Sequence, residues 1–489
     1  MKQMLFMSAL MVGGGLGATL HPYWPLLVYY LLAMLRPDFI WYWALPGGVP
    51  WSLVAGSLVA VSLLIYGPKL LRRLEINLAF ALLVGFVAWL ILANATAMNP
   101  ASSWRWVEPL LKILAAALVT AIVVDRIEHV RLLSLTAFAT LGYIAYHINS
   151  LYYFNGRLDV LHRGFGGLDN NGAALILALG ITFAYAAFGY RERHWAAKTL
   201  RWLSIPVAVA MLHALMLTYS RGAMIACCAG LAWLVLFHHN RRQTFFGLAG
   251  LAVSAVVLAG PEVRERLRTV KYFADDASAQ QRLESWSAAW EMVWQRPITG
   301  FGTRGSMPYL QAYADEITTP VVHNQYLQLA ADGGIPLAIF FVGLLLVGLW
   351  HFRAARLRCL ADAQAENDDD FPKQDPEQTR SHGDTTMSDW PWSFAPDPSP
   401  QLRRRRSESY AVMWLGFEAG LITLAVGGCF ISIESVEPLW MILAIGCVTA
   451  RVNQGWICRP VASPDAEPEG SKQPRGHRGP LPAPTLQGV

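Results

Sequence analysis

Many apolar runs in the sequence are long enough to cross a membrane, and this feature limits most strongly what the chain can fold into. A helix needs about 20 mainly apolar residues to cross the hydrocarbon core of a bilayer. In hydrocarbon every backbone polar group must be bonded internally, so only helices and closed β-barrels can cross. The runs here do not alternate between apolar and polar residues as barrel strands do. Because only 15% of the 489 residues are charged, against about 25% in soluble domains, we predict an all-α, polytopic membrane protein.

The first part of the chain is harder to assign than the rest. The runs that we assign as spans lie near residues 3–20, 24–45, 51–67, 77–96, 107–125, 130–150, 171–189, 202–219, 221–237, 244–260, 335–352, 410–432 and 437–452. Residues 3–20 lack a convincing small-x-small cleavage site, so we expect an uncleaved helix rather than a signal peptide. Prolines interrupt the first 50 residues at Pro25, Pro37, Pro46 and Pro50. We therefore expect one of the first two runs to be a half-membrane hairpin, which leaves about 12 spans.

Basic residues gather in alternate connections between the runs, and this pattern predicts the topology. The basic connections are Pro68–Glu75, Asp125–Arg131, Tyr190–Arg201, His238–Arg242 and His351–Arg358. The positive-inside rule places them in the cytoplasm. The other connections then face outward, at residues 97–106, 151–170, 219–222, 261–334 and 433–436. The outward loop 261–334 is the longest of these, and we expect it to carry the functional site.

The composition divides the chain into four parts. A transmembrane core covers residues 1–352 and includes the outward loop 261–334. Residues 353–409 and 453–489 are rich in charge, proline, serine or glycine, so we predict a disordered cytoplasmic insertion and a disordered tail, with C-terminal spans at 410–452 between them. The block Arg403–Arg406 directly precedes a span, which favours membrane lipids with anionic headgroups over nucleic acid as its partner.

A helix is predicted inside the outward loop, from about residue 279 to residue 296. One face of this helix would carry Leu283, Trp286, Trp290, Val293 and Trp294 at 100° per residue. Such an aromatic face suits the headgroup interface. Arg282 lies at the edge of the same face, where its charge would be held at the depth of lipid phosphates. A surface arginine that snorkels to water fits the same position.

A second motif in the loop reads HNQYL at residues 323–327, followed by Asp332 and two glycines. We expect a short helix on the membrane surface, a glycine break and a helix that enters the membrane. His323 starts the short helix, where the helix dipole disfavours the charged imidazole. A neutral imidazole can take a proton from a hydroxyl group, although a surface histidine without a role fits the same pattern.

No metal or other cofactor is expected. His162 is the other histidine of the larger outward loops, and the two lack the spacing of zinc ligands. The six cysteines all lie outside residues 261–334, which favours neither a disulfide nor a thiolate metal cluster. Residues 300–305 read GFGTRG and match the letters of a dinucleotide fingerprint. No strand precedes them, so we interpret them as a tight turn.

Further charged residues are expected at the outward face. Arg221 lies in the turn between two spans, Lys112 a few residues inside a span, and Asp169 at the start of another. Lys112 can also snorkel to water, and Asp169 can simply cap a helix. Arg221 has to meet water, a carboxylate or a phosphate. With Arg282 and His323 these groups suit a lipid-linked pyrophosphate, because the planar guanidinium binds phosphate in a bidentate manner.

Three short motifs, in this order, resemble the bacterial O-antigen ligase family. They are SRGA at residues 220–223, RLxxWxxAWxMxxxxPxxGFG at 282–302 and HNQYLxxxxxGG at 323–334. The similarity in order and topology covers roughly residues 70–350. The superfamily also contains O-antigen polymerases and protein O-oligosaccharyltransferases.

The resemblance implies a fold, a reaction and a location. The fold has about a dozen membrane helices with short helices in the outward loop. The reaction transfers a glycan from undecaprenyl pyrophosphate to an acceptor hydroxyl, without a nucleotide sugar or a metal, at the periplasmic face of the bacterial inner membrane. Arg221 and Arg282 would bind the leaving pyrophosphate, and His323 would orient or deprotonate the acceptor. Lys112, Asp169, Asn324 and Trp286 are further candidates for substrate binding.

Other functions remain open at this point. The acceptor can be a glycan, a lipid or a protein, so ligase, polymerase and protein glycosylation are not separated by the sequence. A transporter of lipid-linked glycans is a further alternative, although such proteins usually show inverted repeats and ionisable groups near the midplane. Glu418, inside a predicted span, is the main residue of this kind. A purely structural scaffold would leave the outward cations unexplained.

Overall fold

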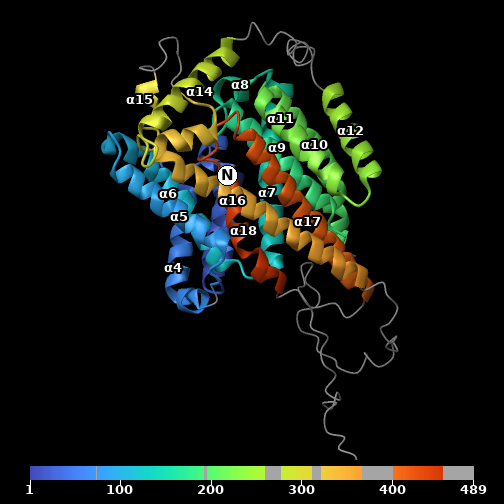
Figure 1. Cartoon of the computed structure of the whole chain (residues 1–489). Helices are drawn as coiled ribbons and strands as arrows, with labels where there is room; N and C mark the ends of the chain where they lie inside the picture. Colours follow the sequence, from blue (N-terminus) through green and yellow to red (C-terminus); the bar gives the residue numbers. More distant parts are fainter. Residues whose placement is uncertain (73, 192–194, 259–276, 311–320, 366–399, 455–489) are drawn as a thin grey trace, which may run out of the picture.

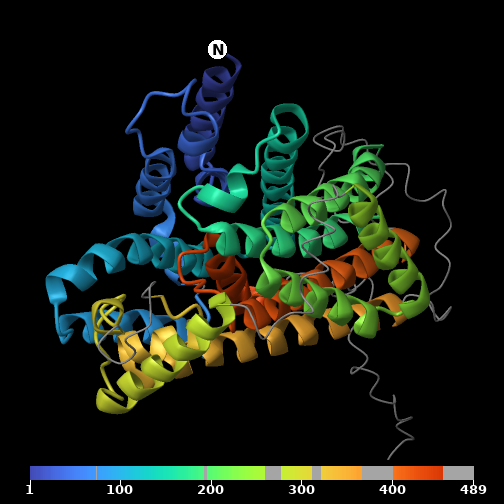
Figure 2. The same ribbon diagram turned by 90° about the horizontal axis from the view of Figure 1, so that it is seen from above.

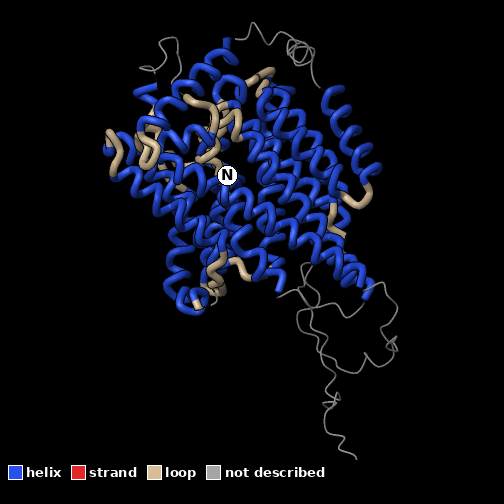
Figure 3. The backbone as a smooth tube through the Cα atoms, in the orientation of Figure 1, coloured by secondary structure: helices blue, strands red, loops and turns tan. Residues whose placement is uncertain are grey.

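The chain folds into a bundle of helices (Figures 1 and 3). The computed structural model describes residues 1–72, 74–191, 195–258, 277–310, 321–365 and 400–454. The helices in these ranges are α1 (Lys2–Ala18), α2 (Tyr23–Leu35), α3 (Pro37–Ile40), α4 (Trp51–Leu71), α5 (Leu78–Ala95), α6 (Pro100–Val123), α7 (Ile127–Asn155), α8 (Asp159–Arg163), α9 (Asn170–Phe188), α10 (Trp195–Leu217), α11 (Arg221–Phe237), α12 (Arg241–Leu258), α14 (Ala277–Gln295), α15 (Met307–Leu310), α16 (Gln325–Ala365), α17 (Pro400–Gly427) and α18 (Glu437–Gln454). Within the same ranges the backbone forms no sheet, apart from an isolated bridge between Phe165 and Leu168.

Seven of the described helices are long and apolar enough to cross a membrane. They are α4, α5, α6, α9, α10, α16 and α17, and the apolar helices α2 and α11 are shorter. The prediction of an all-α, multi-pass membrane protein is thereby confirmed, whereas the number of about 12 spans stays a prediction.

Helices α9 and α17 form the centre of the bundle. Their apolar windows are 83% and 78% buried by the rest of the protein, whereas the other five spans reach 44% at most. In the view from above, α16 covers one side of this centre, and α1, α2 and α4 project from the other (Figure 2). Aromatic side chains fill the contact between α16 and α17, where Phe352 stacks on Trp414 with ring centroids 5.7 Å apart.

Two ends of the bundle can be distinguished. Helices α8, α14 and α15 lie together at one end (Figure 1), which we call the site face. The other end, which we call the opposite face, carries the start of α7 with His129 and Arg131. In the predicted topology the site face is outward and the opposite face is cytoplasmic.

The half-membrane hairpin near the N-terminus stays a prediction, because α1 (17 residues) and α2 (13 residues) are not among the seven helices that are long and apolar enough to cross a membrane. At the opposite face, the Tyr23 hydroxyl donates to the carbonyl of His129, at 2.8 Å. At the site face, Arg36 forms an ion pair of 2.7 Å with Glu437. Helix α1 runs back beside α2, with Phe6 against Trp41.

The prolines interrupt this region as predicted, since α2 ends at Leu35 before Pro37, and three of them lie at or near the start of a helix. Pro25 lies in the first turn of α2, Pro37 starts the separate helix α3, and Pro50 caps α4. At these positions the missing N–H group has no helical partner to lose.

The boundaries predicted for the disordered insertion also differ from the structure. Helix α16 continues past residue 353 to Ala365, and α17 already begins at Pro400. The extension of α16 is stabilised by Arg356, whose Nε donates to Glu418 of α17 at 2.5 Å. Residues 366–399 and the predicted tail beyond Gln454 lie outside the described residues.

Candidate functional site

His323 lies at the site face, in a short connection that leads into α16. Its backbone has a φ of 50°, which a residue with a side chain adopts only at a cost. Bonds on both sides hold it there. The indole N–H of Trp286 donates to the carbonyl of Val322 at 2.9 Å. The side chain of Asn324 accepts from the backbone N–H groups of Tyr326 and Leu327, at 3.0 and 3.2 Å, and so caps α16.

The predicted glycine break is confirmed. Gly334 has a φ of 78° and interrupts the helical geometry of α16. A Cβ atom at this position would lie 2.0 Å from the carbonyl oxygen of Ile298, so the backbone of the preceding turn packs directly on the break. The segment before the break is the short helix that carries the HNQYL motif.

The GFGTRG segment is a turn, as predicted, and it surrounds the buried carboxylate of Asp332. Asp332 accepts from the backbone N–H of Arg304 at 2.8 Å and from the hydroxyl of Ser306 at 2.6 Å. Gln328, one turn earlier on α16, donates to it at 2.7 Å. The second and third motifs therefore form one structural unit, although 20 or more residues separate the two sides of each bond.

Helix α14 is present as predicted, but its aromatic residues do not share one environment. Trp286 and Val293 turn inward to the protein, whereas Leu283, Trp290 and Trp294 are exposed. The reason is that the inward face is formed by small residues and Met292, which pack under Phe301 and Val322. The exposed stripe is the part that suits the headgroup interface.

Arg221 is the first residue of α11 and lies beside the start of α9. Ser220 caps α11 through Ala223, at 3.4 Å, and its hydroxyl bonds to Asn171 of α9 at 2.8 Å. Tyr219 before it has a φ of 54°. Gly222 lets the helix approach the connection after α17, because a Cβ there would lie 2.7 Å from Phe430.

The charges of these segments act on one another, which shows that they are close. Burial lowers the pKa of Arg282, and the positive charge of Arg221 lowers it further, while Asp169 opposes both. Burial also lowers the pKa of His323, as do Arg282 and Arg304, again against Asp169. The structure therefore brings Arg221, Arg282, His323 and Asp169 together from separate parts of the chain.

Asp169 and Lys112, the other charged residues predicted for the site, make different contacts. Asp169 caps α9 by accepting from the backbone of Gly172 at 2.7 Å, so the capping alternative holds for it as well. Lys112 binds Glu108 one turn earlier on α6 at 2.9 Å, and 54% of its side chain is exposed. No interaction in the described part of the chain joins Lys112 to the group around His323, so the structure does not bring it into the site.

The sequence of the site region matches a known family. The family model described as O-antigen ligase matches residues 206–342. This part of the chain is therefore similar to the O-antigen ligase family. No curated protein matches the chain. The match supports glycan transfer of the ligase or polymerase type at a membrane, in general terms.

Three residues near the site were not predicted from the sequence. Arg304, in the GFGTRG turn, forms an ion pair of 2.5 Å with Glu434, beyond the matched region. The buried side chain of Gln325 accepts from the backbone N–H groups of Ile433 and Glu434. Gln325 belongs to a motif that was recognised, so its position next to Asn324 was a usable signal.

Helix ends add to the positive character of the site. Helices α9, α11 and α16 begin at Asn170, Arg221 and Gln325, next to the residues described above. The N-terminus of a helix carries a partial positive charge and N–H groups that bind anions. With Arg221 and Arg282, this arrangement can bind a phosphate or pyrophosphate group.

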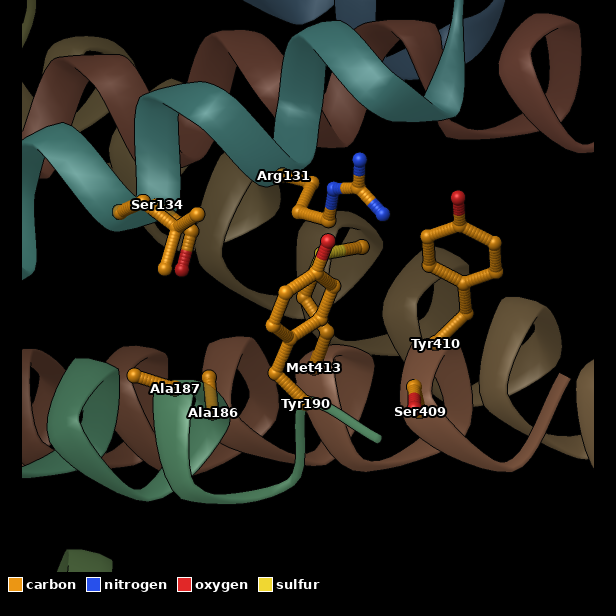
Figure 4. Close-up of a pocket in the computed structure, with 9 residues that line it drawn as sticks. Arg131, Ser134, Ala186, Ala187, Tyr190, Ser409, Tyr410 and Met413 are labelled. Atoms are coloured by element: carbon orange, nitrogen blue, oxygen red, sulfur yellow. The ribbon is translucent and has the colours of Figure 1, made fainter. Parts of the chain in front are cut away.

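A pocket at the opposite face is separate from this group. It lies between the start of α7, the end of α9 and the start of α17, and Arg131, Tyr190 and Tyr410 face into it (Figure 4). The guanidinium carbon of Arg131 lies 4.9 Å from the centre of the Tyr190 ring, so a cation–π contact stabilises this buried charge. None of the predicted site residues lines this pocket.

Proposed function

We propose that the protein transfers a glycan from undecaprenyl pyrophosphate to an acceptor hydroxyl at the periplasmic face of the bacterial inner membrane. The observation that carries this proposal is the grouping of Arg221, Arg282 and His323 from three separate segments, in which the charge of Arg221 acts on Arg282 and the charge of Arg282 acts on His323. The family match supports glycan transfer in general. Membrane lipids surround the protein, and neither a cofactor nor nucleic acid has a part in the proposal.

Each group has a role in the proposed reaction. The acceptor hydroxyl attacks the anomeric carbon of the glycan, and the bond from that carbon to the pyrophosphate oxygen breaks. His323 takes the proton of the hydroxyl, which a neutral imidazole can do. Burial and the neighbouring arginines keep its pKa below the ordinary value of 6.5, so the imidazole is neutral at pH 7.

Arg221 and Arg282 stabilise the charge that develops on the leaving lipid pyrophosphate. Donors that are already held in place act strongly on such a charge, because they need no rearrangement during the reaction. The starts of α9, α11 and α16 support them. Trp286 and Asn324 act on His323 by fixing the backbone on either side of it.

Glu418, the residue that favoured the transporter alternative, has a different explanation. It pairs with Arg356 and also accepts from the indole N–H of Trp233 at 3.0 Å. A carboxylate held in this way connects α11, α16 and α17 and acts as a structural group. We therefore place transport behind glycan transfer.

The test is complementation of a strain that lacks the native gene. His323→Ala, Arg221→Ala and Arg282→Ala should each abolish one glycan ladder on gels at normal membrane levels. Arg157→Ala is the matched control, because Arg157 binds Asp159 at the same face without joining the group around His323. This control should keep the ladder.

The ladder that disappears identifies the acceptor. Loss of the lipopolysaccharide ladder indicates a ligase, loss of chain length a polymerase, and loss of a glycoprotein ladder protein glycosylation. If all three variants support normal ladders, the site is assigned wrongly, and uptake of labelled lipid-linked glycan into vesicles becomes the next measurement.

A further inference from the structure

The connection between α17 and α18, residues 428–436, lies against the segment that carries His323. Gln325, two residues after His323, donates its backbone N–H to the carbonyl of Gly428 at 2.7 Å. Its side chain accepts from the backbone of Ile433 and Glu434. This connection is far from His323 in the sequence and outside the region matched by the family model.

Arg304 holds the same connection from the other side. Its backbone has a φ of 54° and is bound to Asp332, so the start of its side chain is fixed. The guanidinium pairs with Glu434 and lies over the ring of Trp106, 5.4 Å from its centre. The Arg304 and Glu434 side chains are only 17% and 10% exposed, so solvent screens this pair weakly.

We propose that Arg304 and Glu434 are positioning residues for His323: the pair fixes the connection 428–436 against the histidine segment and sets how much positive charge the imidazole meets. This inference rests on the proposed function, in which His323 is the base. The negative charge of Glu434 compensates the positive charge of Arg304. Removal of either residue therefore changes the charge that the His323 imidazole meets.

The groups that act on His323 come from three elements. Arg282 belongs to α14, Arg304 to the turn after it, and Asp169 to the start of α9. The two arginines disfavour the imidazolium, and Asp169 favours it. Removal of Arg304 therefore raises the pKa of His323. Removal of Glu434 leaves the Arg304 charge uncompensated and therefore lowers the pKa of His323.

The test measures the protonation of His323 directly. Purified full-length protein in lipid nanodiscs is treated with diethyl pyrocarbonate at a series of pH values, and modification of His323 is followed by mass spectrometry, because only the neutral imidazole reacts. We expect Arg304→Gln to move the midpoint upward by roughly half a pH unit or more. Glu434→Gln should move it downward.

Glu437→Gln is the matched control. Glu437 follows the same connection, pairs with Arg36 and is also 10% exposed, but it does not contact Arg304. Its midpoint should remain that of the wild type. Arg304→Lys keeps the positive charge but loses the planar guanidinium. The pH midpoint of His323 modification should therefore stay the same, whereas the transfer rate should fall.

Each outcome of this test either supports or overturns the positioning role of Arg304 and Glu434. The proposal is overturned if Arg304→Gln leaves the midpoint unchanged, or if Glu434→Gln and Glu437→Gln behave alike. If Arg304→Gln does not fold, the comparison of Glu434→Gln with Glu437→Gln still decides. The modification does not depend on turnover, so a protein without transfer activity would refute the proposed function and leave this test intact.

Discussion

Trp286→Phe removes a single hydrogen bond and leaves almost all of the ring. In the wild type the indole N–H donates to the carbonyl of Val322 at 2.9 Å. Val322 is fully buried, so water cannot replace the lost donor. A buried carbonyl without a partner costs about 1–3 kcal/mol.

The cost should appear in catalysis because His323 directly follows Val322. The left-handed backbone of His323 is unfavourable by itself and persists only while its surroundings hold it. If 1–3 kcal/mol is lost from the active geometry, the rate falls by roughly 5- to 150-fold, since about 1.4 kcal/mol corresponds to a factor of 10. We expect kcat to fall by about tenfold with little change in the KM of the lipid-linked donor.

The assay is transfer by purified protein from a lipid-linked glycan, with kcat and KM measured separately. Trp290→Phe is the control, because Trp290 lies one turn further on α14 and is 53% exposed. Its kinetics should equal those of the wild type. Equal losses in the two variants, or none in Trp286→Phe, would refute the role of this bond.

Two further predictions concern a cap and a buried ion pair. Asn324→Ala removes the cap of α16, which is worth about 1 kcal/mol. Turnover should therefore fall about fivefold. Asn324→Asp can still accept the two backbone hydrogen bonds and should keep most of the activity. Equal loss in both variants would contradict the capping role. Arg356→Met leaves Glu418 buried without its cation and should cost about 3–5 kcal/mol, measured as a lower unfolding temperature in detergent. The double variant Arg356→Met/Glu418→Leu should recover most of this loss, and a double variant as unstable as the single one would contradict it.

The spans were predictable because lipid imposes a strict rule on apolar runs, and the errors lie where position within a helix matters. Pro37 does interrupt the predicted run, but Pro25 lies in the first turn of α2, and the letters do not say whether a proline falls in the first turn or in the interior. The end of α16 was missed for another reason. Arg356 is a charged residue in a polar stretch, and its partner Glu418 is 62 residues away.

The site was predictable where a residue type is unusual for its place, such as an arginine at a membrane surface or a histidine before a helix. Arg221, Arg282 and His323 were predicted in this way, and in the structure the charge of Arg221 acts on Arg282 and that of Arg282 acts on His323, while their role stays a prediction. Arg304 was read as part of a turn, which it is, but its ion pair joins residues 130 positions apart. The role predicted for Lys112 stays a prediction, and in the structure this residue pairs with Glu108 on the same helix.

Backbone strain is found at the segments that carry the proposed site. Tyr219, Arg304 and His323 all have φ values between 50° and 54°, and each is a residue of the proposed site or lies within two positions of one. Such a conformation costs on the order of 1–3 kcal/mol per residue and must be held by neighbours. The bonds of Ser220 to Asn171, of Arg304 to Asp332 and of Trp286 to Val322 are placed to do this. A reaction that depends on fixed charges around a leaving group needs such prior placement, so weakening any of these three bonds should lower turnover more than it lowers stability.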